Sequence, residues 1–175
     1  QKGGQQLVQI DGCYHLIKPA DNLAVTTRFN QMDLDLLNPF FASVCSDIGG
    51  RLSGQFRLTG SLAAPKLNGE GIIEKGKFKI NYLNTSYQVA GAIKVQENRL
   101  YADQLDLQDS ALGHATLSGH MVLQDGFPLM LSGDMETFHL LHTTRIHHPD
   151  FYGDLYATGT LQMEGSIYDL LLKMK

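Results

Sequence analysis

The sequence is poor in charged residues and has no long apolar run. Asp, Glu, Lys and Arg make up 18% of the 175 residues, which is below the usual quarter. No stretch approaches the run of about 18 apolar residues that predicts a membrane-spanning helix, and there is no signal-peptide pattern. The formal net charge is −4, and Lys and Arg form no cluster. Because phosphate binding needs clustered cations, we expect no nucleic-acid partner.

Cysteine is also scarce, and the motifs of common enzymes are missing. Cys13 and Cys45 are the two cysteines, and their spacing fits no metal or redox motif. They are compatible with a disulfide, with two free thiols or with small buried hydrophobic residues. The chain has no Gly-x-Ser-x-Gly elbow, no phosphate-binding loop and no clear nucleophile–base pair. We therefore expect neither enzymatic activity nor a cofactor.

An alternation of apolar and polar residues fills most of the chain. Residues 54–62 (GQFRLTGSL) place small or apolar side chains at every second position, and residues 159–167 (GTLQMEGSI) repeat this pattern. Successive side chains of a strand point to opposite faces, so each segment predicts a strand with one apolar and one polar face. The 18 glycines stand at strand ends and inside strands, where they indicate turns, bulges or close backbone approach.

One segment departs from the strand pattern and predicts a short helix over residues 38–48. Asn38 suits an N-cap, Pro39 suits the first helical position, and Gly49-Gly50 follows as a stop signal. The apolar residues between them recur at helical spacing, and we expect this face to pack on the sheet. It consists of Phe40, Phe41, Val44, Cys45 and Ile48.

The remaining segments predict about a dozen strands joined by short connections. Asp125-Gly126 between two alternating runs predicts a hairpin, and residues 138–150 form the longest segment expected to be irregular. The expected strands are 7–10, 13–18, 23–30, 51–62, 67–74, 77–82, 86–96, 100–107, 113–124, 128–137, 153–164 and 167–175.

These expectations describe one all-β domain over residues 1–175. Connections this short exclude β-α-β crossovers. A β-sandwich, a closed barrel and an open sheet bent into a trough all remain, because periodicity does not separate them. A sandwich or barrel would fill its interior with side chains. A trough would expose part of its apolar face, which soluble proteins avoid unless that face binds something.

Two polar groups deserve comparison with metal sites. His139-x-x-His142 with His147-His148 is the better candidate, but Asp150 is its one nearby carboxylate, and zinc needs three or four ligands. We therefore expect a solvated loop and no metal. Asp103, Asp106 and Asp109 lack the glycine and terminal glutamate of a calcium loop, so we expect them to flank a turn.

Three groups of residues resemble the TamB family of bacterial envelope proteins. Residues 151–160 (FYGDLYATGT) with Gly165 resemble the "fYG.ayatG…G" stretch near the C-terminal end of that family. Residues 50–54 (GRLSG), 58–62 (LTGSL) and 65–69 (PKLNG) resemble its recurring glycine-rich unit. Residues 78–80 (FKI), 82–85 (YLNT) and Tyr87 resemble the "f.i.YlnT.Y" segment of Bacteroidetes-like versions. The resemblance runs from about residue 30 to the end of the sequence.

The resemblance implies an open, U-shaped sheet with a hydrophobic inner groove. In this family the groove is thought to carry phospholipid acyl chains, or to shield nascent outer-membrane strands, across the periplasm of a diderm bacterium. It also implies a longer protein anchored in the inner membrane, of which this chain is a fragment. The implied partner is TamA or a BamA-like outer-membrane barrel, contacted by the full-length protein. The family is not known as an enzyme.

A set of aromatic and aliphatic residues is expected to line this groove. In a sandwich the same residues would simply pack against one another as core. The alternative function is then a secreted binding or adhesion module that acts through loops such as 138–150. The predicted lining residues are Phe56, Leu58, Phe78, Ile80, Tyr87, Val89, Ile93, Leu117, Met121, Leu161 and Met163.

Overall fold

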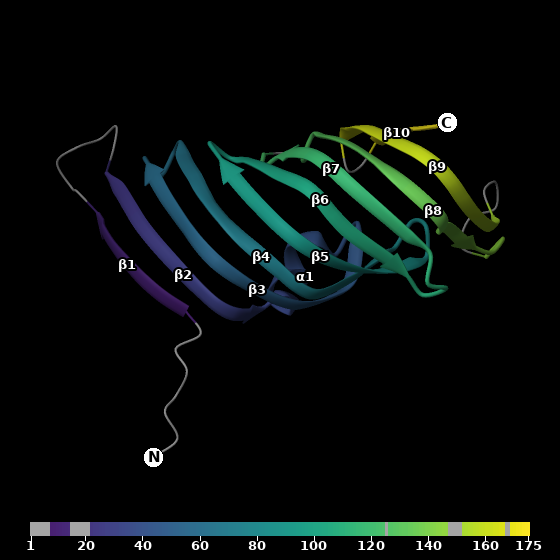
Figure 1. Cartoon of the computed structure of the whole chain (residues 1–175). Coiled ribbons are helices and arrows are strands. Elements are labelled where there is room, and N and C mark those ends of the chain that lie inside the picture. The colour runs from purple at the N-terminus through teal and green to yellow at the C-terminus, as the bar shows by residue number, and fades with distance from the viewer. Residues whose placement is uncertain (1–7, 15–21, 125, 147–151, 167–168) are drawn as a thin grey trace, which may run out of the picture.

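Ten antiparallel strands form one sheet in which the spatial order of the strands is their order in the sequence (Figure 1). The structure is a computed structural model and describes residues 8–14, 22–124, 126–146, 152–166 and 169–175. The strands are β1 (Val8–Tyr14), β2 (Leu23–Asp33), β3 (Cys45–Gly60), β4 (Pro65–Ile80), β5 (Thr85–Gln96), β6 (Arg99–Asp109), β7 (His114–Val122), β8 (Leu129–Thr143), β9 (Gly153–Ser166) and β10 (Asp169–Met174).

The sheet is open, with β1 and β10 at its two edges. It is therefore neither a closed barrel nor a sandwich of two sheets, and the predicted all-β fold with one open, bent sheet is confirmed. Figure 1 shows the strands as long, curved ribbons that follow one another across the molecule. Nine spacings of about 4.8 Å make such a sheet about 43 Å wide along its arc.

The pairing register collects the apolar residues of every strand on one face. On β3, Leu58 pairs with Val25 of β2 and with Leu67 of β4. Further along the sheet, Leu131 of β8 pairs with Met163 of β9. Directly paired residues point to the same side of a sheet, so these rows continue one another. The alternation read from the sequence thus becomes one continuous apolar face.

The apolar face is concave, because the sheet curls toward it. Tyr87 of β5 stacks on Phe138 of β8, with ring centroids 5.0 Å apart and planes 11° apart. Two strands, β6 and β7, lie between β5 and β8 in the sheet. Side chains separated by three strand spacings meet only if the sheet bends around them, since a flat sheet would hold them about 14 Å apart. We call this side of the sheet the concave face.

Bulges make the strands longer than the alternation predicts. The segments 67–74 and 77–82 were expected to be two strands, but β4 runs through both, with a register shift between Ile73 and Gly76. The expected irregular segment 138–150 is wrong over its first part, because β8 continues to Thr143. Register shifts at Met135/Phe138 and His139/Leu141 interrupt the period of two there. A bulge inserts an extra residue, which hides the strand from a search for strict alternation.

The one short helix predicted near residues 38–48 is present, but it is a single turn and residues 45–48 are strand. A 3₁₀ helix, η1 (Leu34–Leu37), and one turn, α1 (Asn38–Phe41), precede β3, which already begins at Cys45. Asn38 is not the N-cap. Its side chain accepts a hydrogen bond from the backbone N–H of Ile48 at 3.0 Å and donates to the Ile48 carbonyl at 2.9 Å. Residues 45–48 therefore satisfy their backbone groups through β4 and Asn38, not through a helix.

The expected packing of the helical face is wrong for Phe40, whose surface is 75% exposed. Phe41, Val44 and Ile48 are half-buried. The Phe41 ring lies 5.7 Å from that of Phe127 in the β7–β8 connection. A turn between β2 and β3 reaches β7–β8 only on the side toward which the sheet curls, so α1 covers part of the concave face. Figure 1 accordingly shows α1 behind β4 and β5.

Glycines on the concave face allow neighbouring backbones to approach closely. A Cβ atom at Gly133 of β8 would collide with the carbonyl oxygen of Thr116, and one at Gly54 of β3 would collide with that of Glu70. Both obstacles are backbone atoms of paired strands, which cannot turn aside as a side chain can. These two positions therefore need glycine for steric reasons rather than for a special φ angle.

Gly133→Ala is expected to destabilise the fold, although alanine ordinarily suits a strand better than glycine does. Forcing a methyl group against the Thr116 carbonyl should cost about 1–3 kcal/mol in free energy of unfolding. The neighbouring change Ser132→Ala, on the exposed opposite face, should stay within about 0.5 kcal/mol. Urea unfolding of both variants measures the difference, and equal stabilities would contradict this account.

Candidate functional site: the concave face

All eleven predicted lining residues lie on the concave face, because each occupies the same register rows as the apolar residues of its neighbouring strands. Their surroundings differ along the strands. Tyr87 and Leu161 are 4% exposed. The other nine are half-buried, although α1 is the one helix that covers part of this face among the described residues.

One end of the concave face is packed like a protein core. We call this group the closed-end cluster; it consists of Tyr87, Leu107, Ala115, Met135, Phe138 and Leu161. It lies where β5 to β9 curl together. Five predicted lining residues pack against it from the side: Phe78, Ile80, Val89, Leu117 and Met163.

Hydrogen bonds beside this cluster stabilise the curvature of the sheet. The Tyr87 hydroxyl donates a hydrogen bond to the His139 carbonyl at 2.8 Å, and burial raises the pKa of Tyr87 to about 12. The buried Asp109 carboxylate accepts hydrogen bonds from the backbone N–H groups of Ala111, Gly113 and His139 at 2.7, 2.9 and 2.6 Å. Asp109 thus joins the β6–β7 turn to β8, and the three backbone N–H groups provide hydrogen bonds to its buried carboxylate.

Four predicted lining residues lie toward the other end of the concave face, where Val95 of β5 is also buried at 4% exposure. Phe56, Leu58, Ile93 and Met121 are half-buried, and the closed-end cluster does not include them. We call these four residues the distal set. They come from β3, β5 and β7, near the strand ends opposite the cluster. Interchangeable aliphatic and aromatic side chains of this kind offer contact to an apolar chain without fixing its position.

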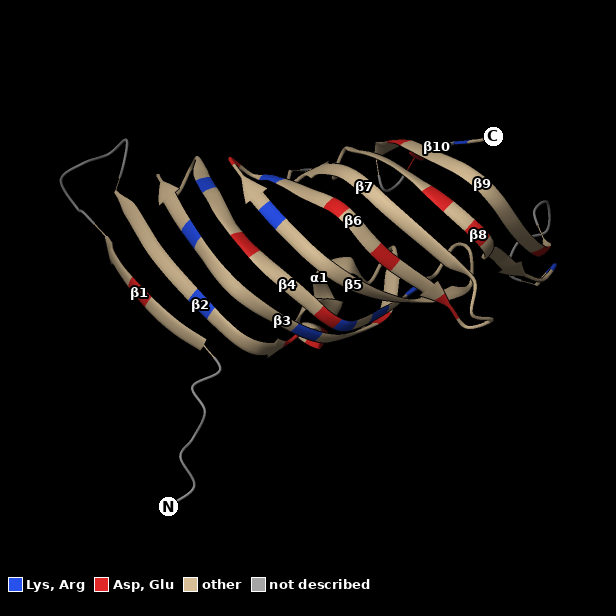
Figure 2. Ribbon diagram, viewed as in Figure 1, with Lys and Arg blue, Asp and Glu red and all other residues tan. Residues whose placement is uncertain are grey.

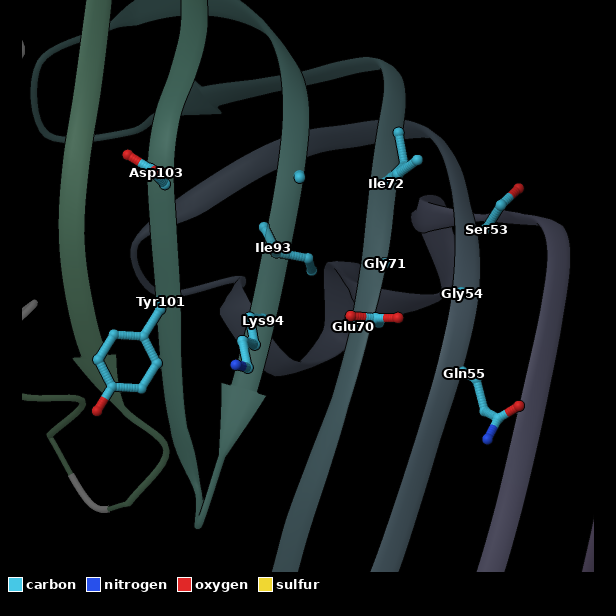
Figure 3. Close-up of a pocket in the computed structure, with 11 residues that line it drawn as sticks. Ser53, Gly54, Gln55, Glu70, Gly71, Ile72, Ile93, Lys94, Tyr101 and Asp103 are labelled. Carbon is cyan, nitrogen blue, oxygen red and sulfur yellow. The ribbon is translucent and has the colours of Figure 1, made fainter.

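The opposite, convex face is polar and carries charges of both signs. Figure 2 shows Lys and Arg interspersed with Asp and Glu over the strands, without a large area of one sign. A depression of about 630 Å³ lies on this face over β3 to β6. Its labelled side chains, among them Gln55, Glu70, Lys94 and Tyr101, come from four strands and do not converge on one point (Figure 3). Its apolar lining is limited to Ile72, Ala92, Ile93 and the ring of Tyr101, so the concave face, with its continuous apolar rows, is the better candidate.

The acidic residues compared with a calcium loop do not form one group. Asp109 is buried and bonds to the backbone, whereas Asp103 and Asp106 are exposed on the strand. Cys13 and Cys45 form no disulfide with each other. Cys13 is exposed, and burial raises the pKa of the half-buried Cys45.

The histidine candidate proves to be a different group from the expected one. His139 and His142 lie on β8, and the carboxylate beside them is Asp154 of β9, which pairs with His142. His147, His148 and Asp150 lie outside the described residues. Asp154 was not predicted as a partner of the histidines, because residues 138–143 were expected to be irregular. A strand there would have placed the residues after Gly153 opposite the histidines.

Comparison with protein-family models, with curated proteins and with solved structures gives no match to this chain. The resemblance to the TamB family therefore stays a prediction. Across the parts of the chain that the structure describes, none of the helices is long and apolar enough to span a membrane.

Proposed function

We propose that the concave face binds the acyl chains of phospholipids or similar amphiphiles and shields them from water. The observation that supports this most directly is a single ten-stranded sheet in which rows of apolar residues continue from strand to strand on the concave face, with large side chains left half-buried there. Exposing an acyl chain of about fifteen methylenes to water costs on the order of 12 kcal/mol. A continuous apolar surface removes most of that cost without any specific contact.

An acyl chain fits this face better than a polypeptide strand does. A β-strand needs backbone hydrogen-bond partners, which a sheet offers at its edges. The concave face instead presents side chains such as those of the distal set. Shielding of nascent outer-membrane strands, the other cargo implied by the TamB resemblance, would therefore need an edge strand, β1 or β10. We favour lipid for this reason.

The proposal includes the setting that the resemblance implies. The chain would be part of a periplasmic bridge in a diderm bacterium, anchored in the inner membrane by another part of the full-length protein. A TamA or BamA-like outer-membrane barrel would be its partner at the far end. The protein would have no enzymatic role. The mixed charge of the convex face is compatible with an aqueous compartment on that side.

Native mass spectrometry of protein purified without detergent tests lipid binding. We expect additional masses that correspond to phospholipids or fatty acids of more than one head-group class, because the concave face offers apolar contacts rather than a head-group site. Protein that carries no lipid, and that takes none up from vesicles of mixed phospholipids, would contradict the proposal. A single lipid species with one head group would contradict its lack of specificity.

A further inference from the structure

We propose that His139, His142 and Asp154 form a binding site for a transition-metal ion, with Zn²⁺ as the expected occupant. The site lies on the outer, polar side of β8 and β9, so it is independent of what the concave face binds. One ligand atom from each residue lies within 4.8 Å of the others. Two imidazoles and one carboxylate are a common donor set for zinc.

Two of the three distances between ligand atoms are within about 1 Å of the separation that a tetrahedral zinc ion needs. Ligand atoms bound at 2.0–2.1 Å lie about 3.4 Å apart. His139 Nε2 lies 3.2 Å from Asp154 Oδ1, and His142 Nδ1 lies 2.5 Å from the same oxygen. The second pair is within hydrogen-bond distance, and a metal ion would take the place of the proton between the two atoms. The side chains of His142 and Asp154 are 57% and 58% exposed, so they can separate by the required ångström.

The ring of His139 is fixed in orientation by its neighbours, and the other two ligands are exposed to solvent. Its ring stacks on Tyr156 with centroids 4.3 Å apart and planes 9° apart. Its backbone N–H donates to Asp109, and its carbonyl accepts from Tyr87. The ring orientation is therefore fixed before any ion binds, which lowers the entropic cost of binding. Three protein ligands leave a fourth position for water or an external ligand.

The Asp154 carboxylate favours a cation at this point, because it lies beside both imidazoles. Nitrogen donors make the site unsuited to Ca²⁺ and Mg²⁺, which prefer oxygen ligands throughout.

A bound ion would join β8 to β9 next to the β4–β5 turn. The His142 backbone N–H donates to the Leu83 carbonyl in the β4–β5 turn, and the Asn84 side chain donates to the His142 carbonyl at 2.7 Å. Zinc would therefore strengthen a junction of three segments. Because an ion that binds the folded chain stabilises it, the melting temperature should rise with zinc concentration.

Isothermal titration of Zn²⁺ into the chelator-treated chain at pH 7.5 tests the site. We expect one equivalent to bind, with no binding of Mg²⁺. His142→Ala and Asp154→Asn should each weaken binding by about tenfold or more; both residues are exposed, so the fold should tolerate the changes. The matched control His114→Ala, on the exposed start of β7, should bind as the unaltered chain does, and so should a His147→Ala/His148→Ala variant.

Two results would overturn the proposal. The first is an unaltered chain that takes up no zinc at micromolar concentration. The second is zinc binding that survives in a His142→Ala/Asp154→Asn double variant, because the ion would then lie elsewhere. Loss of zinc binding in the His147→Ala/His148→Ala variant would place the ion at those two histidines. Thermal melting gives an independent readout, because zinc should raise the melting temperature of the unaltered chain and of His114→Ala but not that of His142→Ala.

Discussion

Leu58→Arg is expected to abolish lipid binding and to leave the sheet folded. Leu58 is half-buried on the concave face and belongs to the distal set, outside the closed-end cluster. A long arginine side chain can lay its stem along the apolar surface and place its charge in water, so the cost to folding is small. The same charge at the contact surface has to be desolvated when an acyl chain binds, which opposes binding.

The same substitution at Leu161 should instead destabilise the fold. Leu161 is 4% exposed in the closed-end cluster, so Leu161→Arg would bury an unpaired charge. We expect a loss of about 4 kcal/mol or more in free energy of unfolding, which is enough to unfold a marginal domain. Thermal melting and native mass spectrometry of both variants form the test. Unfolding of Leu58→Arg would show that the distal set is ordinary core, and full lipid binding by folded Leu58→Arg would argue against binding on this face.

Phe138→Ala is expected to be among the most destabilising single truncations on the concave face. Phe138 is 4% exposed and stacks on Tyr87, three strands away in the sheet. Its removal would leave a cavity at the point where the sheet curls, and comparable truncations cost about 3–5 kcal/mol. The control is Phe40→Ala, since Phe40 is 75% exposed and should contribute less than about 0.5 kcal/mol. Denaturant unfolding that ranks the two variants equally would contradict the assigned role of Phe138.

The sequence predicted the face of each strand better than the ends of the strands. Alternation depends on side chains that point to opposite sides, so Leu58, Leu117 and Met163 could be assigned to one face before their strand partners were known. The sequence left sandwich, barrel and open sheet undecided, since all three use the same alternation. The curvature of the sheet depends on contacts between distant strands, such as that between Tyr87 and Phe138. A local sequence pattern does not predict such contacts.

The errors have local physical causes. Asn38 and Pro39 are typical of a helix start, but the Asn38 side chain binds the backbone of Ile48, and β4 pairs with residues 45 and 46. Strand pairing therefore prevailed over a helical preference that is weak in so short a segment. Around His139, two bulges broke the period of two and concealed the end of β8. The partnership of His142 with Asp154 was hidden for the same reason.

Photo-crosslinking from opposite faces of one strand tests the central claim most directly. A photoreactive residue at Leu58 would lie on the concave face, and one at Arg57 would lie on the convex face of the same strand, because a shift of one residue reverses the side. After irradiation in cells and purification, we predict lipid adducts at Leu58 and none at Arg57. Adducts at neither position, or equal adducts at both, would contradict the proposal that the concave face carries acyl chains.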